Sequence, residues 1–171
     1  MRKTALVKVS GDLVQRPDVL EWLRELAKSN YVVICTGGGV QINAVFEEKG
    51  YGRNYGTLGR NTKTFEERQL ARDILEKNQA ELQDLLAANG IPATVLIPVL
   101  DIGSVLCHVN GDVFVLTAYL GYDALWILTL EDRVAEKDRQ VREIWSAFGG
   151  GKYKEDFPAK LHIKGFPGTV G

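Results

Sequence analysis

Cysteine is scarce in this sequence, and long apolar runs are missing. The two cysteines, Cys35 and Cys107, lie in or beside apolar segments, which predicts buried free thiols in a reducing compartment rather than a disulfide framework. No apolar stretch reaches the roughly 18 residues that a membrane span needs. The first residues, MRKTALVKV, have no apolar region before a cleavage site. We therefore expect a cytoplasmic protein with no membrane partner.

The sequence also has no large excess of charge and no metal-ligand pattern. The net charge is −1 and the pI is about 6.1, which argues against a general nucleic-acid binder. No cluster of cysteine and histidine has the spacing of metal ligands, so we expect no metal site. What remains is ordinary: 171 residues, 45% hydrophobic and 25% charged, as in a soluble chain with one domain or one domain with a lobe.

Short apolar runs alternate with segments of helical periodicity. Strands are predicted at residues 4–10, 31–36, 93–99, 125–130 and 159–164, and helices at 17–30, 40–49, 64–89, 113–120 and 136–147. Residues 108–134 contain the clearest unit, which is a polar turn, a helix, a buried strand and a second polar turn. The alternation predicts an α/β fold, a three-layer α/β/α sandwich with a mainly parallel sheet.

Polar residues and glycines gather where the predicted strands end. Lys8 and Gly11 close the first strand, the run Gly37 to Gly39 follows the second, and Glu131 and Asp132 follow the strand at 125–130. Ligands of such sheets bind beyond the carboxyl ends of the strands. His108, Asn110 and Asp112 precede a helix on the same rim, and a helix start attracts anions. The glycine run matches neither G-x-x-x-x-G-K-[ST] nor G-x-G-x-x-G.

Four of the polar residues allow two interpretations each. Lys8 either meets an anionic group inside the sheet or points to water from an edge strand. Arg53 and Arg60, in the glycine-rich loop at 50–63, either clamp an acidic or phosphorylated substrate or lie on a solvated surface. Asn78 falls on the apolar face of the helix at 64–89, where it contacts a ligand or makes a helix–helix hydrogen bond. His162 alternates with two apolar residues and is expected to face away from the core.

Four short motifs, taken in order, resemble the amino acid kinase superfamily, which includes acetylglutamate kinase, uridylate kinase, aspartokinase and carbamate kinase. The resemblance covers residues 3–138, roughly. Its motifs are Lys8-Val9-Ser10-Gly11, Thr36-Gly37-Gly38-Gly39, His108-Val109-Asn110-Gly111-Asp112 and Leu128-Thr129-Leu130-Glu131-Asp132-Arg133-Val134. It implies one amino acid kinase-like domain over residues 1–171, with an acceptor-binding part at 1–107 and a shortened nucleotide-binding part at 108–171.

The resemblance implies transfer of the γ-phosphoryl group of ATP, with Mg²⁺, to a small carboxylate or phosphate acceptor. Such a reaction needs positioning and charge compensation more than a general base. It also implies a homodimer. The implied catalytic residues are Lys8, Asp112 and Lys152; the substrate-binding residues are Gly11, Gly37, Gly38, Gly39, Arg53, Arg60, Asn78 and Asn110; the nucleotide-binding residues are Lys8, Thr129, Glu131, Asp132 and Lys152.

The sequence departs from that family after the last motif. Residues 135–171 are fewer than family members have there, so the nucleotide site is reduced, completed by another subunit, or absent. The alternative function is a non-catalytic relative that binds a small anionic ligand or serves as a subunit of an assembly. The kinase requires Lys8 and Lys152 to converge near Asp112, whereas the alternative leaves them apart.

Overall fold

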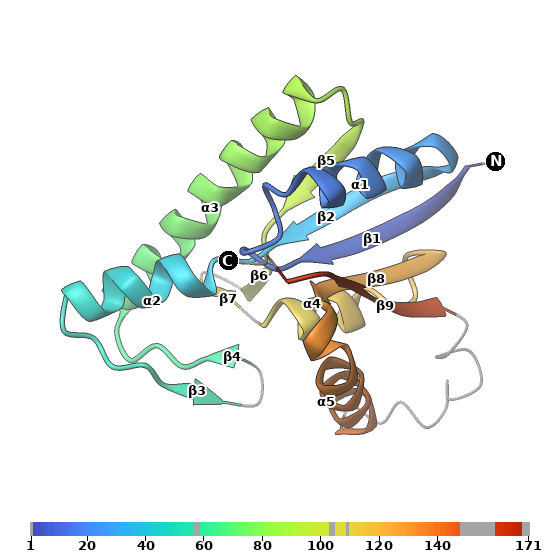
Figure 1. Ribbon diagram of the computed structural model, residues 1–171. Helices are drawn as coiled ribbons and strands as arrows, with labels where there is room; N and C mark the ends of the chain where they lie inside the picture. The colour runs from blue at the N-terminus through green and yellow to red at the C-terminus, as the bar shows by residue number, and fades with distance from the viewer. Residues whose placement is uncertain (1, 57–58, 103–104, 109, 148–159, 169–171) are drawn as a thin grey trace.

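The computed structural model describes residues 2–56, 59–102, 105–108, 110–147 and 160–168 (Figure 1). Its centre is a five-stranded sheet with the order β5-β2-β1-β8-β9. Every neighbouring pair in this sheet runs parallel. The strands are β1 (Lys3–Val9), β2 (Asn30–Thr36), β5 (Ala93–Leu96), β8 (Ala124–Leu130) and β9 (Leu161–Phe166).

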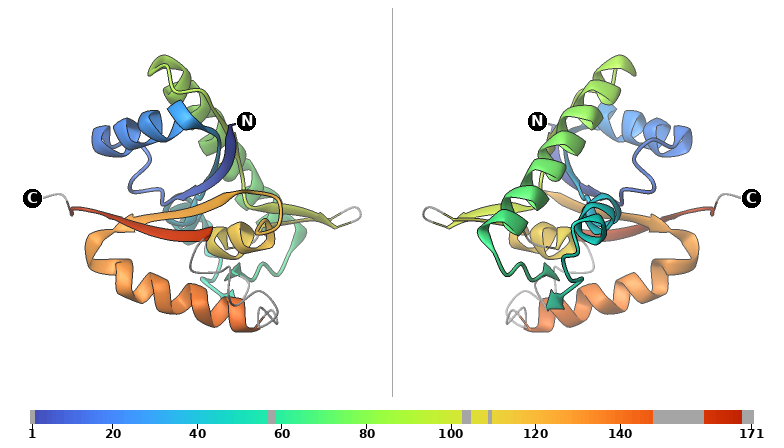
Figure 2. Two further views of the ribbon diagram at one scale, coloured as in Figure 1. Left: turned by 90° about the vertical axis from the view of Figure 1, so that its right-hand side faces the viewer. Right: turned by 90° about the vertical axis from the view of Figure 1, so that its left-hand side faces the viewer.

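The middle strand β1 explains why the sheet must be covered on both sides. Ala5, Leu6 and Val7 are all fully buried, although successive residues point to opposite faces. Helices α1 (Pro17–Ser29) and α3 (Phe65–Ala88) pack on the face of Val7, and α4 (Gly111–Thr117) and α5 (Val134–Ala147) pack on the face of Leu6 (Figure 2). The predicted α/β fold with a parallel sheet between helical layers is confirmed.

Helices α1 and α3 begin where local chemistry favours a start. Pro17 occupies the first turn of α1, where its missing N–H does no harm. The hydroxyl of Thr64 accepts from the Glu67 N–H at 3.1 Å, and the Glu67 carboxylate accepts from the Lys63 N–H at 2.6 Å. Since these bonds satisfy groups that a helix start leaves open, they fix where α3 leaves the preceding loop.

The outer edge of β5 is closed by side chains of α3. Gln83 donates to the Ala93 carbonyl and accepts from the Val95 N–H, both at 2.9 Å, and Gln79 donates to the Val95 carbonyl at 2.7 Å. These amides take the place of a further strand along an edge that would otherwise be open. They also fix α3 relative to the sheet, while α2 (Gly39–Glu48) packs against α3 through Ile42 and Phe46.

Two segments differ from the sequence-based prediction. The predicted strand at 93–99 is wrong in extent, because β5 ends at Leu96 and a separate antiparallel pair follows, β6 (Val99–Ile102) with β7 (Val105–His108). Pro98 interrupts the apolar run, and a proline inside a strand favours such a break. The predicted loop at 50–63 contains a two-residue ladder, β3 (Tyr55–Gly56) with β4 (Gly59–Arg60).

The remaining differences are small shifts of boundaries. The polar turn after β8 is a 3₁₀ helix, η1 (Glu131–Arg133), which leads directly into α5.

Both predicted parts of the chain contribute strands to the sheet. The sheet takes β1, β2 and β5 from residues 1–107 and β8 and β9 from residues 108–171. Among the described residues, no helix has both the length and the apolar character that a membrane crossing needs.

Candidate functional site

The sheet has its topological switch point beside β1. The chain moves from β1 to β2 and β5 on one side, whereas β8 and β9 lie on the other side. In open parallel sheets a crevice forms at the carboxyl ends of the strands around such a point. A cavity of about 320 Å³ lies there, and we call it the strand-end cavity. It is lined by Lys8, Ser10, Gly11, Asp12, Gly37, Gly38, Gly39, Val40, Ile42, Tyr55, Gly59, Arg60, Leu75, Pro98, Asn110, Gly111, Asp112, Arg133 and Lys137.

Two lysines from distant elements share one buried carboxylate in this cavity. The Lys137 Nζ atom lies 2.8 Å from Asp112 Oδ2, and the Lys8 Nζ atom lies 3.5 Å from Asp112 Oδ1. Lys8 also donates to the Ser10 hydroxyl at 2.9 Å, and Lys137 donates to Gln140 at 3.2 Å. An ammonium group has three donors, so each lysine keeps one for a ligand.

Asp112 stays ionised because of these lysines. Burial by itself raises the pKa of its carboxyl, but the positive charges of Lys8 and Lys137 outweigh burial and lower that pKa below its usual value. Gly111 leaves space for the arrangement, since a Cβ there would lie 3.3 Å from Lys8 Cγ and Cε. Lys8 therefore meets an anionic partner inside the sheet and does not point to water.

The glycine run supplies backbone donors on the opposite wall. Gly38 is the N-cap of α2 and has no side-chain cap, so the first N–H groups of this helix are open to an anion. Asn78 donates to the Gly37 carbonyl at 3.2 Å. The carbonyl and the following N–H of a trans peptide point in opposite directions. Asn78 thus directs the Gly38 N–H away from α3, and among the described residues its amide bonds the backbone before α2 rather than another helix.

Arg60 reaches the same cavity from β4. Only 8% of the residue is exposed, and its Cζ atom lies 4.9 Å from the ring centres of both Phe46 and Tyr55. Its Nη2 atom donates to Asn43 and to the Tyr55 hydroxyl, whereas its buried Nη1 atom has no hydrogen-bond partner among the residues that the structure describes. Burial lowers the pKa of the guanidinium, and Tyr55 partly offsets this. No described carboxylate forms an ion pair with Arg60.

The structure brings together most, but not all, of the predicted site residues. Those that line the strand-end cavity are Lys8, Gly11, Gly37, Gly38, Gly39, Arg60, Asn110 and Asp112. Asn110 is the N-cap of α4, and its side-chain oxygen accepts from the Asp112 N–H at 2.8 Å. Arg53 is exposed and pairs with Glu47 instead. Asn78 is not among the residues that line the cavity, and it donates a hydrogen bond to the Gly37 carbonyl.

Of the predicted nucleotide-binding residues, Lys8 lines this cavity, whereas Thr129, Glu131 and Asp132 do not. Thr129 is buried in β8, and Glu131 and Asp132 are exposed in η1. Lys152 lies outside the described residues, as do the side chains of His108 and Cys107. Cys35 is a buried free thiol, as predicted, and burial raises its pKa to about 12. His162 is half-buried and stacks on Trp126, with ring centres 4.3 Å apart.

Sequence reasoning missed Lys137, Arg133 and Ser10. Lys137 carried a signal, because it lies four residues before the buried Val141 and therefore on the inner face of α5. A lysine on the apolar stripe of a helix needs an anionic partner. Ser10 and Arg133 are polar residues at the ends of strands or beyond them, and nothing in their local pattern distinguishes them from surface residues.

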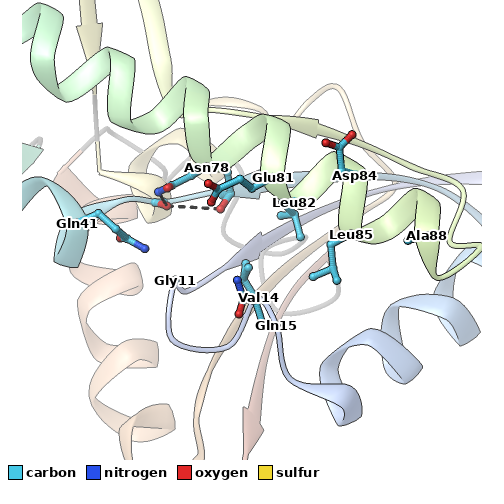
Figure 3. Close-up of a pocket in the computed structure, with 12 residues that line it drawn as sticks. Gly11, Val14, Gln15, Gln41, Asn78, Glu81, Leu82, Asp84, Leu85 and Ala88 are labelled. Atoms are coloured by element: carbon cyan, nitrogen blue, oxygen red, sulfur yellow. Dashed lines mark hydrogen bonds between the residues drawn. The ribbon is translucent and has the colours of Figure 1, made fainter.

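A second cavity, of about 410 Å³, lies between α3 and the loop that follows β1 (Figure 3). We call it the α3 cavity. It shares Gly11 and Gly37 with the strand-end cavity. Its other lining residues are Val14, Gln15, Thr36, Gln41, Asn78, Glu81, Leu82, Asp84, Leu85 and Ala88.

Comparisons with known proteins show the fold but no family. Neither a protein-family model nor a curated protein matches the chain. The solved structure of smu.665 from Streptococcus mutans UA159 aligns over 75% of this chain and 73% of that protein, with 17% identity and a TM-score of 0.58. N-acetylglutamate synthase from Neisseria gonorrhoeae, complexed with coenzyme A and L-arginine, aligns over 77% of this chain, with 14% identity and a TM-score of 0.50. The match covers 45% of the synthase chain, so this chain spans less than half of it.

These comparisons overturn the assignment to the amino acid kinase superfamily. No family model of a kinase matches the chain. N-acetylglutamate synthase, the similar structure whose name states an activity, was solved with coenzyme A and not with ATP. We therefore withdraw the ATP-dependent kinase reaction, and with it ATP and Mg²⁺ as cofactors. The four motifs mark an anion-binding site at the carboxyl ends of parallel strands. A site of this kind is compatible with several different reactions.

Proposed function

We propose that the strand-end cavity binds a small molecule through an anionic group, either a carboxylate or a phosphate. Four basic side chains line it, Lys8, Arg60, Arg133 and Lys137, against two acidic ones, Asp12 and Asp112. The lining therefore has a formal excess of two positive charges. Open N–H groups at the start of α2 add to the attraction.

The observation that carries this proposal is the state of Arg60. A buried guanidinium without a carboxylate partner is costly, because burial removes its hydration and nothing replaces it. Arg60 is held by two aromatic rings and two neutral acceptors, and its Nη1 atom is left over. An arginine held in this way is preorganised to bind a carboxylate or phosphate oxygen.

The Asp112 pair with Lys8 and Lys137 supports the same conclusion. Asp112 offsets one of the two positive charges and fixes both ammonium groups at the cavity wall. An incoming anion then completes the charge balance without displacing the carboxylate. Positioned cations of this kind stabilise a bound anion and also a negative charge that develops during a reaction.

Acyl transfer in a small-molecule enzyme is a second candidate for the reaction. It rests on the fold shared with N-acetylglutamate synthase, which was solved with coenzyme A. The cavity would then hold the carboxylate of the acyl acceptor or a phosphate of the coenzyme. Arg60 and the two lysines suit either group.

Titration calorimetry with inorganic phosphate, N-acetyl-L-glutamate and coenzyme A tests both candidates. We expect at least one of these probes to bind, and Arg60→Gln to weaken that binding about tenfold or more, because a hydrogen bond to a charged group contributes about 1.5–3 kcal/mol. Arg53→Gln is the matched control, since it removes an exposed arginine from the same loop.

Three results would contradict the proposal or narrow it. No binding of any probe at several millimolar would reject the anion site, and an equal loss of affinity in both variants would reject the role of Arg60. Coenzyme A that binds no more tightly than phosphate would reject the acyl-transfer candidate. ATP with Mg²⁺ belongs in the same series, since we expect it to bind no more tightly than inorganic phosphate.

A further inference from the structure

The α3 cavity differs in polarity from the strand-end cavity beside it. The described residues of its lining include no lysine, arginine or histidine, and the charged ones are Glu81 and Asp84. Figure 3 shows Glu81 extending along α3 toward Asn78, whereas Asp84 points away from the loop that carries Gly11. One carboxylate, that of Glu81, therefore faces this cavity. It has one long ion pair, 3.8 Å to the exposed Lys77.

The two cavities adjoin at two glycines. Gly11 and Gly37 line both of them. The side-chain amide of Gln41 lies over Gly11, since a Cβ on that glycine would be 3.7 Å from its Oε1 and 3.9 Å from its Nε2. The side chain of Gln41 makes no hydrogen bond within the part of the chain that the structure describes, so its amide can contact a ligand at the junction.

From this arrangement we infer that the two cavities form one elongated site for a ligand with charges of opposite sign at its ends. The anionic group binds at Arg60, Lys8 and Lys137, the ligand passes Gln41 over Gly11, and an ammonium group binds at Glu81. The inference rests on the proposed function and names its substrate class: a small carboxylate that carries an amino group several bonds away.

The unused polar atoms are consistent with this class of ligand. At one end the buried Nη1 atom of Arg60 lacks an acceptor within the described part of the chain. At the other end Glu81 has only its long ion pair with the exposed Lys77 among the described residues, and no cation is among the described residues that line its cavity. Leu82 and Leu85 line the same cavity, and they suit the methylene groups of a flexible chain.

The test compares ligands that differ only in the amino group. The probes are 4-aminobutyrate, 5-aminovalerate and 6-aminohexanoate, each beside butyrate, valerate or hexanoate, titrated by NMR. We expect one chain length to bind about fivefold more tightly with the amino group than without it, as an ion pair at a half-exposed site contributes about 1 kcal/mol. The Gln41 side-chain amide signals should shift with that probe.

Glu81→Gln should abolish this preference while leaving the affinity for the plain carboxylates unchanged. Glu76→Gln is the matched control, because Glu76 lies on the same helix and pairs with Arg72. Equal affinity for both series at every length, or a preference that survives in Glu81→Gln, would overturn the inference alone. If no carboxylate binds but inorganic phosphate does, the inference is overturned alone, and if inorganic phosphate fails to bind as well, the proposed function is overturned together with it.

Discussion

Asp112 shows at the scale of one residue how a costly buried charge becomes part of a site. Its side chain is 4% exposed, and it contacts lysines from β1 and α5. In the folded chain its pKa lies below the value near 3.9 that is typical of an unfolded chain. The unfolded chain therefore binds more protons as the pH falls through this window, and stability rises with pH there.

Asp112→Asn should lower the free energy of unfolding at pH 7 by about 3 kcal/mol, because it leaves two partly buried ammonium groups without their counter-charge. The contribution of Asp112 is fully present above about pH 5 and is lost as the pH falls through its folded pKa. Urea denaturation at pH 7 and at pH 3 should thus show a smaller difference in the variant than in the wild type.

The matched control for this change is Asp138→Asn, which removes an exposed pair with Arg142. Its cost should stay below about 1 kcal/mol, since exposed pairs contribute little. If the two variants lose equal stability, or if Asp112→Asn keeps the full pH dependence of the wild type, the assigned role of Asp112 is wrong.

Helix α3 joins the fold to the site at the scale of one element. Leu82 and Leu86 cover a face of the sheet, Gln79 and Gln83 close the edge of β5, and Asn78 holds the Gly37 carbonyl. The packing at Gly38 is tight, because a Cβ there would lie 3.0 Å from Asn78 Nδ2 and 3.1 Å from Leu75 Cδ2. The helix therefore sets the position of the backbone that faces the strand-end cavity.

Asn78→Ala should weaken binding of the anionic probe about fivefold, because the loss of a hydrogen bond worth about 1 kcal/mol frees the Gly37–Gly38 peptide to turn. Gln79→Ala is the matched variant, since it removes an amide that donates to the Val95 carbonyl at 2.7 Å, away from the cavity. Both should cost similar stability in denaturation, and Asn78→Ala alone should change the affinity measured by calorimetry. Equal affinities for the two variants would limit Asn78 to a structural role.

Elements were easier to predict from the sequence than the contacts between them. Period-2 and period-3.6 patterns placed α1, α3 and β8 within a few residues. The carboxyl-end rule then brought Lys8, Gly37 and Asp112 to one rim. The partner of Asp112 on α5 could not be found in this way, because a lysine on a helix does not show which distant carboxylate it meets. The β6–β7 pair was also not predicted, because it interrupts the βαβ alternation.

At the scale of the whole molecule, the last strand joins the two predicted parts of the chain. β9 adds to β8 in parallel and closes one side of the sheet, and Phe166 packs in the same core cluster as Val7 and Leu23. Trp22 of α1 and Trp126 of β8 lie with ring centres 5.1 Å apart. Contacts of this kind join residues 1–107 to residues 108–171 across one core, so we expect the two parts to unfold together.

Gly165→Ala tests this coupling at the point where β9 meets η1. A Cβ there would lie 2.8 Å from Glu131 Cα and 2.8 Å from Val134 Cγ2, and forcing an atom into packed space costs about 2 kcal/mol. Gly168→Ala is the control, because a Cβ at that glycine would meet nothing within 4 Å. Tryptophan fluorescence and far-ultraviolet circular dichroism, followed through the same urea titration, should give coincident transitions in the wild type and an earlier but still coincident transition in Gly165→Ala. A fluorescence transition that separates from the dichroism transition would show that residues 108–171 unfold on their own.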